Sequence, residues 1–213
     1  MFRFKQFAVR QDRCPMKVGT DGVLLGAWAE VRPGDRRMLD VGTGTGLIAL
    51  MLAQRSAARI TAVDVDAECA TQAAENFAAS PWADRLDAVA VAVQRYDPVE
   101  RFDLIVSNPP YIASAEVEKL MPEVRDHEPR MALDGTEDGL HFYRRIIEEA
   151  GKHLVSSGML FFEIGYDQGQ AVSELMRTEG YREVQVVQDY AGLDRVVFGT
   201  YVTVQPAPFA KSR

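Results

Sequence analysis

The chain has 213 residues, 47% hydrophobic and 26% charged, a composition typical of one folded domain rather than a disordered or collagen-like chain. Its net charge of −7 excludes a protein that coats nucleic acid through a uniformly basic surface. There is no membrane-length apolar run, no secretory signal and no zinc-like or disulfide-like spacing of Cys and His, so we expect a cytoplasmic protein with no membrane partner, no metal and no disulfide.

The N-terminal segment, residues 1–17, departs from the acidic balance of the chain. Basic residues and phenylalanines alternate along it, at Arg3, Lys5, Arg10, Arg13 and Lys17 and at Phe2, Phe4 and Phe7. This alternation is typical of an edge strand or a flap that docks its rings on the core, and also of a surface that stacks on bases and holds phosphates. We favour the docked flap, but retain direct RNA contact with Lys5, Arg13 and Lys17 as candidate substrate-binding residues.

Short β-rich runs alternate with runs of helical period along the rest of the chain, which predicts a sheet covered by helices. We expect seven strands, at Arg37–Val41, Arg59–Asp64, Asp87–Val93, Phe102–Ser107, Met159–Ile164, Glu183–Gln188 and Arg195–Val204. One helix is expected at Leu47–Arg55, and two shared apolar faces predict others, formed by Ala70, Ala73, Ala74 and Phe77 and by Leu140, Tyr143, Ile147, Ala150 and Leu154.

The last two predicted strands are joined by the short segment Asp189–Asp194, which leaves no room for a crossover helix. The predicted fold class is therefore α/β, with a Rossmann-like, seven-stranded, mostly parallel sheet, a C-terminal antiparallel hairpin and helices on both faces. We expect residues 1–30 to cap the site, residues 31–205 to form the main domain and residues 206–213 to form a tail.

A glycine-rich turn follows the first predicted strand of this sheet, in the run Asp40-Val41-Gly42-Thr43-Gly44-Thr45-Gly46. Glycines let the backbone turn tightly and approach a ligand, and the following helix offers free N–H groups at its start. Gly44, Gly46 and Ala49 also satisfy the dinucleotide pattern GxGxxA, so a nicotinamide or flavin cofactor stays open at this point.

Asp64 ends the next predicted strand, 18 residues after Gly46. A carboxylate at this place can accept hydrogen bonds from both hydroxyls of a ribose. The nearby Asp66 is better explained as the N-terminal residue of a helix.

A second motif, Asn108-Pro109-Pro110-Tyr111, follows the strand Phe102–Ser107 and so lies on the same edge of the sheet as the glycine turn. A nitrogen conjugated to a π-system is a poor nucleophile because its lone pair is delocalised. The side-chain carbonyl of Asn108 and the main-chain carbonyl of Pro109 can each accept a hydrogen bond from one N–H group of this nitrogen. Held in this way, the nitrogen directs its lone pair at an electrophile. The prolines stiffen this backbone, and Tyr111 can stack on a planar group.

Together the two motifs resemble the Rossmann-like S-adenosylmethionine-dependent methyltransferases that act on planar nitrogens. The resemblance implies S-adenosylmethionine as cofactor, its methionine part held at Asp40, Gly42, Gly44 and Gly46 and its ribose at Asp64, with Asn108 also in contact. It implies Asn108, Pro109 and Tyr111 as catalytic residues, and Asn108, Pro110 and Tyr111 as substrate-binding residues. The acid that usually follows the third strand of this superfamily is replaced by Ala92-Val93-Gln94.

The two halves of the chain resemble different branches of that superfamily. Residues 2–111 are similar to the tRNA(Val) adenine-N6 methyltransferases, through Phe4-Lys5-Gln6-Phe7, Asp12-Arg13-Cys14 and the run from Met16 to Trp28. The later part is similar to the release-factor glutamine N5-methyltransferases, through Met121–Arg125, Glu128-Pro129, Ala132–Gly135, Asp138-Gly139, Phe142-Tyr143, Glu163-Ile164-Gly165 and Asp194-Arg195-Val196. The chain therefore resembles a mosaic joined near the tetrad, and it lacks the N-terminal helical domain that usually accompanies the second pattern.

From these patterns we expect N6-methylation of an adenine in tRNA(Val), with tRNA as the partner. The alternative is N5-methylation of a glutamine in a peptide chain release factor, and a second alternative is a cofactor-binding protein without catalysis. Residues 112–138 carry eight acids against three bases, which argues against RNA near that segment. The N-terminal helical domain that usually binds the release factor was not recognised in the sequence, which argues against the release factor as the substrate.

Overall fold

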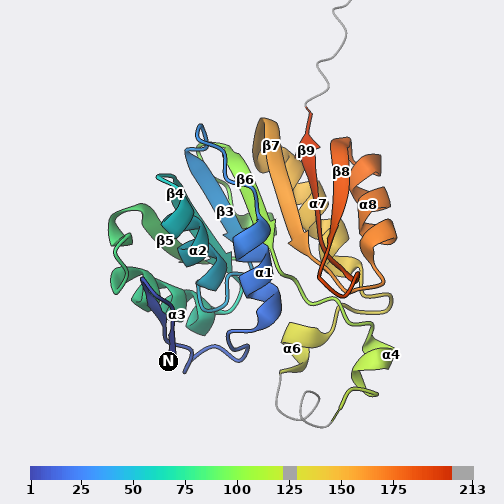
Figure 1. The fold of residues 1–213 in the computed structure, drawn as a ribbon, viewed down its shortest axis with the longest axis horizontal. Helices are drawn as coiled ribbons and strands as arrows, with labels where there is room; N and C mark the ends of the chain where they lie inside the picture. The colour runs from blue at the N-terminus through green and yellow to red at the C-terminus, as the bar shows by residue number, and fades with distance from the viewer. Residues whose placement is uncertain (122–128, 203–213) are drawn as a thin grey trace, which may run out of the picture.

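The computed structural model describes residues 1–121 and 129–202, which form an α/β fold around one seven-stranded sheet (Figure 1). The strands are β3 (Arg37–Val41), β4 (Arg59–Asp64), β5 (Leu86–Ala90), β6 (Phe102–Ser107), β7 (Leu154–Glu163), β8 (Tyr181–Gln188) and β9 (Asp194–Tyr201). Their order is β5-β4-β3-β6-β7-β9-β8. Neighbours from β5 to β7 are parallel, whereas β9 is antiparallel to both β7 and β8. The predicted fold class and the C-terminal hairpin are confirmed.

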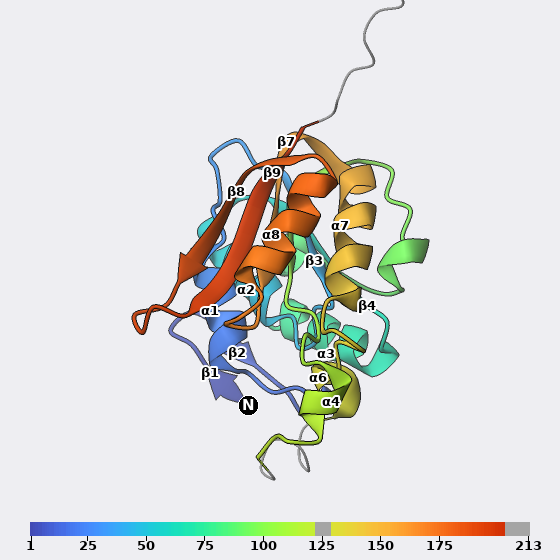
Figure 2. The same cartoon turned by 90° about the vertical axis from the view of Figure 1, so that its right-hand side faces the viewer.

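Helices cover both faces of the sheet (Figure 2). One face carries α1 (Thr20–Trp28), α2 (Leu47–Arg55) and α3 (Ala67–Ala78), and the other carries α7 (His141–His153) and α8 (Gly169–Thr178). Leu104 and Val106 of β6 pack toward α2, while Ile105 between them packs toward α7. Because a central parallel strand buries both of its faces, its sequence is a continuous apolar run instead of an alternating one.

The connections on the edge that carries the two motifs are short or irregular. On this edge a single 3₁₀ turn, η2 (Val93–Arg95), lies between β5 and β6, whereas another, η1 (Ala83–Arg85), leads into β5 at the opposite edge, where Arg85 bonds the carbonyl of Ala58 just before β4. Two one-turn helices, α4 (Ser114–Val117) and α6 (Arg130–Leu133), follow β6. The edge of the sheet is therefore bounded by loops that can hold a ligand.

The N-terminal segment forms a small hairpin, β1 (Phe2–Arg3) with β2 (Ala8–Val9), which the sequence analysis did not foresee. Phe7 is buried; its ring stacks on Phe4 at 4.6 Å and meets the edge of Trp82 at 5.7 Å between ring centroids. The docked-flap interpretation holds for these two rings, while Phe2 stays 45% exposed.

Several expectations within the fold need correction. Leu154, expected on the apolar face of a helix, begins β7 instead, and the strand expected to begin at Glu183 begins at Tyr181. In α3, Ala74 is exposed, because polar Gln72 and Asn76 occupy the buried face and bond the main chain of the N-terminal segment. The strand expected to begin at Met159 begins at Leu154, because a bulge lets β7 continue through the Ser-Ser-Gly stretch. The strand expected over 87–93 ends at Ala90, because the chain then turns into η2.

Parts of several expectations lie outside the described residues: Pro122–Arg125 and Glu128 of the release-factor-like pattern, residues 203–204 of the last predicted strand, and the tail 206–213. Leu25 and Ala29 of the N-terminal region share one core with Leu50, so the division at residue 30 remains a prediction. Among the residues that the structure describes, no helix is long and apolar enough to span a membrane, and no cluster of His, Cys, Asp and Glu has metal-site geometry.

Candidate functional site

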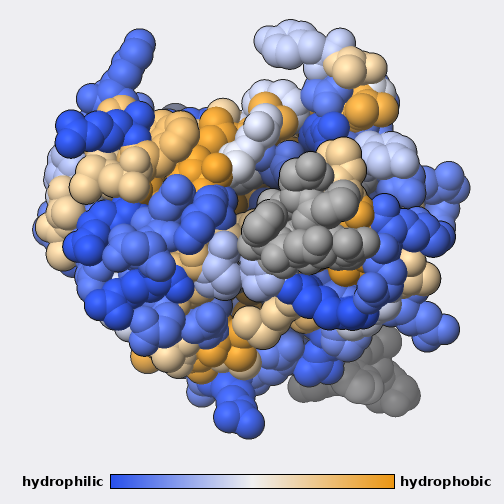
Figure 3. Space-filling model, turned by 90° about the horizontal axis from the view of Figure 1, so that it is seen from below, coloured by the Kyte–Doolittle hydropathy of each residue, from blue (hydrophilic) through white to orange (hydrophobic). Residues whose placement is uncertain are grey.

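The carboxyl ends of β3, β4 and β6 border one cavity of about 430 Å³. Its walls include the glycine turn from Gly42 to Thr45, the segment from Val63 to Asp66 and the tetrad from Asn108 to Tyr111. Figure 3 looks onto this edge of the molecule, where hydrophobic surface lies among hydrophilic side chains. The two motifs that the sequence analysis singled out therefore face a common cavity.

The glycine turn presents its backbone to this cavity. A Cβ atom added at Gly42 or Gly44 would meet no atom within 4 Å, so the space in front of both residues is open. The Gly42 N–H donates to the carbonyl of Val63 at 2.9 Å, and the Gly44 N–H donates to Asp64 Oδ2 at 2.8 Å. The turn is thus fixed to the end of β4 and leaves room for a ligand directly above it.

Asp40 and Gly46 are set back from the cavity. Asp40 is fully buried, and its Oδ2 accepts hydrogen bonds from the Thr43 hydroxyl at 2.7 Å and the Ala49 N–H at 3.2 Å, while burial raises its pKa to about 7. A Cβ at Gly46 would lie 2.6 Å from the Phe77 ring, so this glycine is required by packing against α3. The assignment of Asp40 and Gly46 to cofactor binding remains a prediction. From these positions the two residues would influence a cofactor through the shape of the glycine turn.

Asp64 lies at the end of β4 with its carboxylate in the cavity wall. Its two oxygens accept hydrogen bonds from the N–H groups of Gly44 at 2.8 Å and Asp66 at 2.9 Å. Burial raises the pKa of this carboxyl, and the two backbone donors oppose the shift. Each oxygen can accept a further bond, as a pair of ribose hydroxyls requires. Asp66 caps α3 through the Glu68 N–H at 2.8 Å, as predicted.

Replacing Asp64 by alanine is expected to weaken the binding of S-adenosylhomocysteine by about 1–3 kcal/mol, because the ribose hydroxyls lose their acceptor and the N–H groups of Gly44 and Asp66 lose theirs. Isothermal titration calorimetry measures this effect, with Asp66→Ala as the control for loss of a neighbouring carboxylate. Equal affinity in the wild type and Asp64→Ala would contradict the ribose assignment.

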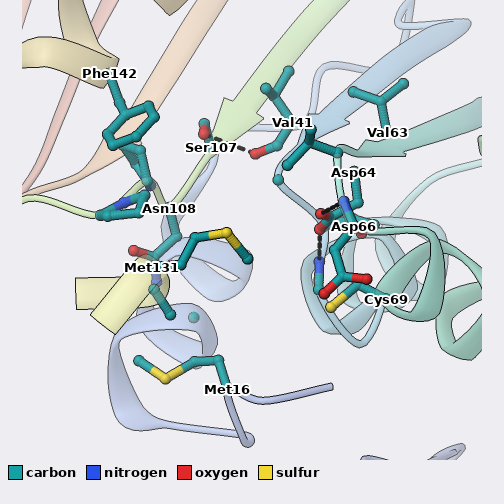
Figure 4. A pocket seen from close by; sticks show the side chains of 18 of the residues that line it. Met16, Val41, Val63, Asp64, Asp66, Cys69, Ser107, Asn108, Met131 and Phe142 are labelled. Carbon is teal, nitrogen blue, oxygen red and sulfur yellow. Dashed lines mark hydrogen bonds between the residues drawn. The ribbon is translucent and has the colours of Figure 1, made fainter. Parts of the chain in front are cut away.

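The tetrad lies at the same edge of the sheet as the glycine turn, because Ser107 of β6 is paired with Val41 of β3. The Ser107 hydroxyl, just before it, donates to the main-chain carbonyl of Val41 at 2.8 Å, which ties the end of β6 to the end of β3. Asn108 faces the cavity across from Asp64 (Figure 4). Its carboxamide forms no hydrogen bond to any residue in 1–121 or 129–202, so both its donor and its acceptor remain available to a ligand.

Apolar and aromatic side chains make up the cavity wall around Asn108. They come from parts of the chain far apart in the sequence, namely Met16, Tyr111, Met131, Phe142 and Ile146. Figure 4 shows Met16, Met131 and Phe142 on the side of the cavity where Asn108 lies. The sequence analysis named Tyr111 as a site residue but missed the others as wall residues, although Met16 and Phe142 lay inside quoted motifs. Such a wall suits a flat, weakly polar acceptor.

The opposite end of the cavity, beyond Asp64, is lined by Val65, Cys69 and the segment from Val91 to Gln94. No acid occupies the position after β5, in agreement with the departure noted in the sequence. Cys69 and Cys14 are buried free thiols.

Of the three candidate substrate-binding cations, only Lys17 lines the cavity. Its ammonium donates to the main-chain carbonyls of Gln11 at 2.6 Å and Cys14 at 2.8 Å. Arg13 is turned toward α3, where its guanidinium pairs with Glu68 at 3.0 Å and Glu75 at 3.3 Å. Lys5 is exposed on the N-terminal hairpin loop. Substrate contact by these cations remains a prediction.

The comparisons with known proteins agree with this arrangement. A family model described as methyltransferase small domain matches residues 21–124. The tRNA1(Val) (adenine(37)-N6)-methyltransferase of Parabacteroides distasonis is 41% identical over 181 residues, which cover 84% of this chain and 72% of that protein. The enzyme of the same name from Phocaeicola vulgatus is 58% identical over 114 residues, 54% of this chain and 48% of that protein. The chain spans about half the length of several of the curated relatives that it matches.

Solved structures share the fold at low sequence identity. The hMettl16 catalytic domain in complex with the MAT2A 3'UTR hairpin 6 has a TM-score of 0.72 and 19% identity, covering 93% of this chain and 78% of that chain. The N-methyltransferase NodS from Bradyrhizobium japonicum, solved with S-adenosyl-L-homocysteine, has a TM-score of 0.52 and 18% identity, covering 85% of this chain and 84% of that chain.

The fold, the open glycine turn and the tetrad on one cavity define the class of Rossmann-like methyltransferases that use S-adenosylmethionine. Within that class, the chain belongs to the tRNA1(Val) (adenine(37)-N6)-methyltransferase family.

Proposed function

We propose that the protein transfers a methyl group from S-adenosylmethionine to the exocyclic N6 of an adenine in tRNA1(Val). The carrying observation is that Asn108, whose carboxamide bonds none of the residues that the structure describes, faces the same cavity as the open glycine turn and Asp64. The names of the relatives point to the same reaction. A tRNA substrate implies a cytoplasmic location.

The residues of the chain have separate tasks in this proposal. S-adenosylmethionine supplies a methyl group on a positively charged sulfur, which is an electrophile. Gly42, Gly44 and Asp64 would hold that cofactor, while Asn108 and the carbonyl of Pro109 accept hydrogen bonds from the two N–H groups of the adenine amine and orient its lone pair. Formation of the N–CH₃ bond is balanced by cleavage of the S–CH₃ bond, with S-adenosylhomocysteine as the leaving group and one amine proton released to water. Tyr111 stacks on the base.

The acidic segment is little compensated by its ion pairs. Among its described residues, Glu116 pairs with Lys119, and Glu118 and Asp134 pair with Arg130, but both of these bases are already counted in the balance of eight acids against three bases. Arg144, outside the segment, pairs with Asp138 and offsets one further negative charge. The apolar wall around Asn108 favours a base over a polar glutamine side chain as the acceptor.

A labelling experiment tests the proposal. The protein is incubated with S-adenosylmethionine labelled on the methyl group and with one of three acceptors: unmodified tRNA1(Val), the same transcript with guanosine at position 37, or a peptide chain release factor. We expect label only in the first. Label in the release factor would establish the glutamine alternative, and cofactor binding without label in any acceptor would support the non-catalytic alternative.

The N-terminal cations give a further prediction under this proposal. Arg3 and Lys5 have no hydrogen-bond or ion-pair partner among the described residues, whereas Arg10 and Arg13 are paired with acids of the chain. We expect the double variant Arg3→Gln, Lys5→Gln to reduce the slope of log K for tRNA against log salt by about 1.5, because roughly two phosphate contacts are lost.

The double variant Arg10→Gln, Arg13→Gln removes the same charge and serves as the control. Its slope should match that of the wild type. Parallel slopes in all three proteins would remove the N-terminal segment from the RNA interface.

A further inference from the structure

The segment after the tetrad is paired with a later segment, residues 133–136. Ile112 bridges to Asp134 in a parallel arrangement: its N–H donates to the Leu133 carbonyl at 3.0 Å, and its carbonyl accepts from the Gly135 N–H at 2.8 Å. The Ser114 hydroxyl then donates to Asp134 Oδ1 at 2.6 Å. This ladder fixes the chain just beyond Tyr111.

Two glycines from the release-factor-like pattern lie directly against the backbone of Tyr111. A Cβ at Gly135 would be 2.7 Å from the Tyr111 Cα, and a Cβ at Gly139 would be 2.3 Å from the Tyr111 carbonyl oxygen. Side chains at these positions would therefore displace the end of the tetrad. The Tyr111 carbonyl also accepts a hydrogen bond from the side chain of Gln168.

The Gln168 carboxamide joins four parts of the chain. Its Nε2 donates to the carbonyls of Tyr111 at 2.9 Å and Gly139 at 3.4 Å. Its Oε1 accepts from the Gly165 N–H at 3.1 Å. It also lies 3.4 Å from the Tyr143 hydroxyl, whose proton is shared with the nearer carbonyl of Glu163 at 3.0 Å. The amide orientation is determined by the Tyr111 carbonyl, which requires a donor, and by the Gly165 N–H, which requires an acceptor.

The tetrad is thus tied to the sheet at both of its ends. Before Asn108, the Ser107 hydroxyl bonds β6 to β3. After it, Gln168 bonds the Tyr111 carbonyl to the end of β7, the strand that pairs with β6 through Ser107 and Phe162. Because a displacement of about 1 Å at reacting groups can cost two orders of magnitude or so in rate, the second tie matters to an acceptor held by Asn108.

Building on the proposed methyl transfer, we propose that Gln168 is a positioning residue. Its Nε2 donor fixes the Tyr111 carbonyl and so fixes the position of Asn108 and Pro109 in the cavity. Gln168 does not line the cavity and touches neither reactant. The Nε2 donor is the part of Gln168 that acts on the tetrad, because the Oε1 acceptor contacts Gly165 and Tyr143.

The variant Gln168→Glu isolates that donor. A carboxylate keeps the acceptor for Gly165 and Tyr143 but loses the donor to Tyr111. At pH 8 we expect kcat to fall at least about tenfold while the Kd for S-adenosylhomocysteine stays within about twofold. As the pH is lowered, protonation restores an O–H donor, so the ratio of variant to wild-type kcat should rise.

Gln170→Glu is the matched control, because it makes the same change two residues later on the exposed side of α8, where Gln170 bonds only Glu174. The uncharged variant Gln168→Leu provides a second test if the glutamate prevents folding. Amide hydrogen exchange of residues 111–114 gives a readout that needs no acceptor: it should be faster in both Gln168 variants and unchanged in Gln170→Glu.

These readouts separate the positioning role from the proposed function. Wild-type exchange and wild-type kcat in a folded Gln168 variant would overturn the positioning role, as would a loss confined to cofactor affinity. A wild-type protein that labels no acceptor would count against the proposed function alone, since the exchange measurement would still decide whether Gln168 holds the tetrad.

Discussion

Replacing Asn108 by alanine is expected to lower the rate of methyl transfer by about two to three orders of magnitude. The side chain supplies an acceptor to the amine at the moment its lone pair is used, and no other described side chain at the tetrad offers the same carboxamide to the cavity. Single-turnover kinetics with labelled S-adenosylmethionine measure this rate directly.

The affinity for S-adenosylhomocysteine should be almost unchanged in Asn108→Ala, because Asp64 and the glycine turn are intact. Calorimetry of the variant provides this control. A variant that retained activity within about tenfold of the wild type would contradict the positioning of the nitrogen by the tetrad.

The second large effect concerns Glu163, which ends β7 fully buried. Within residues 1–121 and 129–202, neither of its carboxylate oxygens has a well-formed hydrogen bond. Burial raises its pKa to about 9, and repulsion from Asp21 of α1 adds to the shift, while Arg195 of β9 and the Tyr111 side chain oppose it. In the unfolded chain the same carboxyl titrates near its ordinary value of 4.5. The folded protein therefore retains a proton that the unfolded chain loses between these two values.

Because the folded state binds more protons in that window, stability decreases as the pH rises, by about 1.4 kcal/mol per pH unit. Replacing Glu163 by glutamine removes this term. We expect the free energy of unfolding of Glu163→Gln, relative to the wild type, to increase by roughly 3 kcal/mol between pH 5.5 and pH 8.

Urea titrations at several pH values measure the difference. Glu179→Gln, at an exposed site between α8 and β8, is the control and should keep a constant offset from the wild type. A constant offset for Glu163→Gln as well would show that Glu163 is ionised in the folded protein.

The sheet could be predicted closely because its parallel strands bury both faces. β3, β4, β6 and α2 begin and end at the residues expected from the sequence, since continuous apolar runs between Gly, Asp and Arg mark both boundaries. Where polar residues are buried, this signal fails. Asn76 in α3 is buried because its side-chain amide forms hydrogen bonds with the main chain of Arg10 and Thr45. The hydrophobic periodicity of the sequence does not predict such partners.

The site was predictable to the extent that its chemistry is local in sequence. The tetrad and Asp64 each follow a strand, so their common edge could be derived from the topology. Gln168 could not be found this way, because its partners at Tyr111, Gly139 and Gly165 are brought together only by the tertiary fold. The glycines of the release-factor-like pattern were visible in the sequence, but their steric role against Tyr111 was not.

The position of β9 between β7 and β8 also affects the order in which the protein can assemble during synthesis. The free edge of β7 has no partner until residues 194–201 have left the ribosome, and β8, made earlier, joins the sheet only through β9. Pairing across this distance in sequence is slow compared with the local βα units that carry the glycine turn. Since the Ile164 N–H beside Gly165 bonds the Arg195 carbonyl at 3.0 Å, we expect a nascent chain to form the half with the glycine turn first and to complete the support of the Asn108–Tyr111 tetrad only when the last strand is in place.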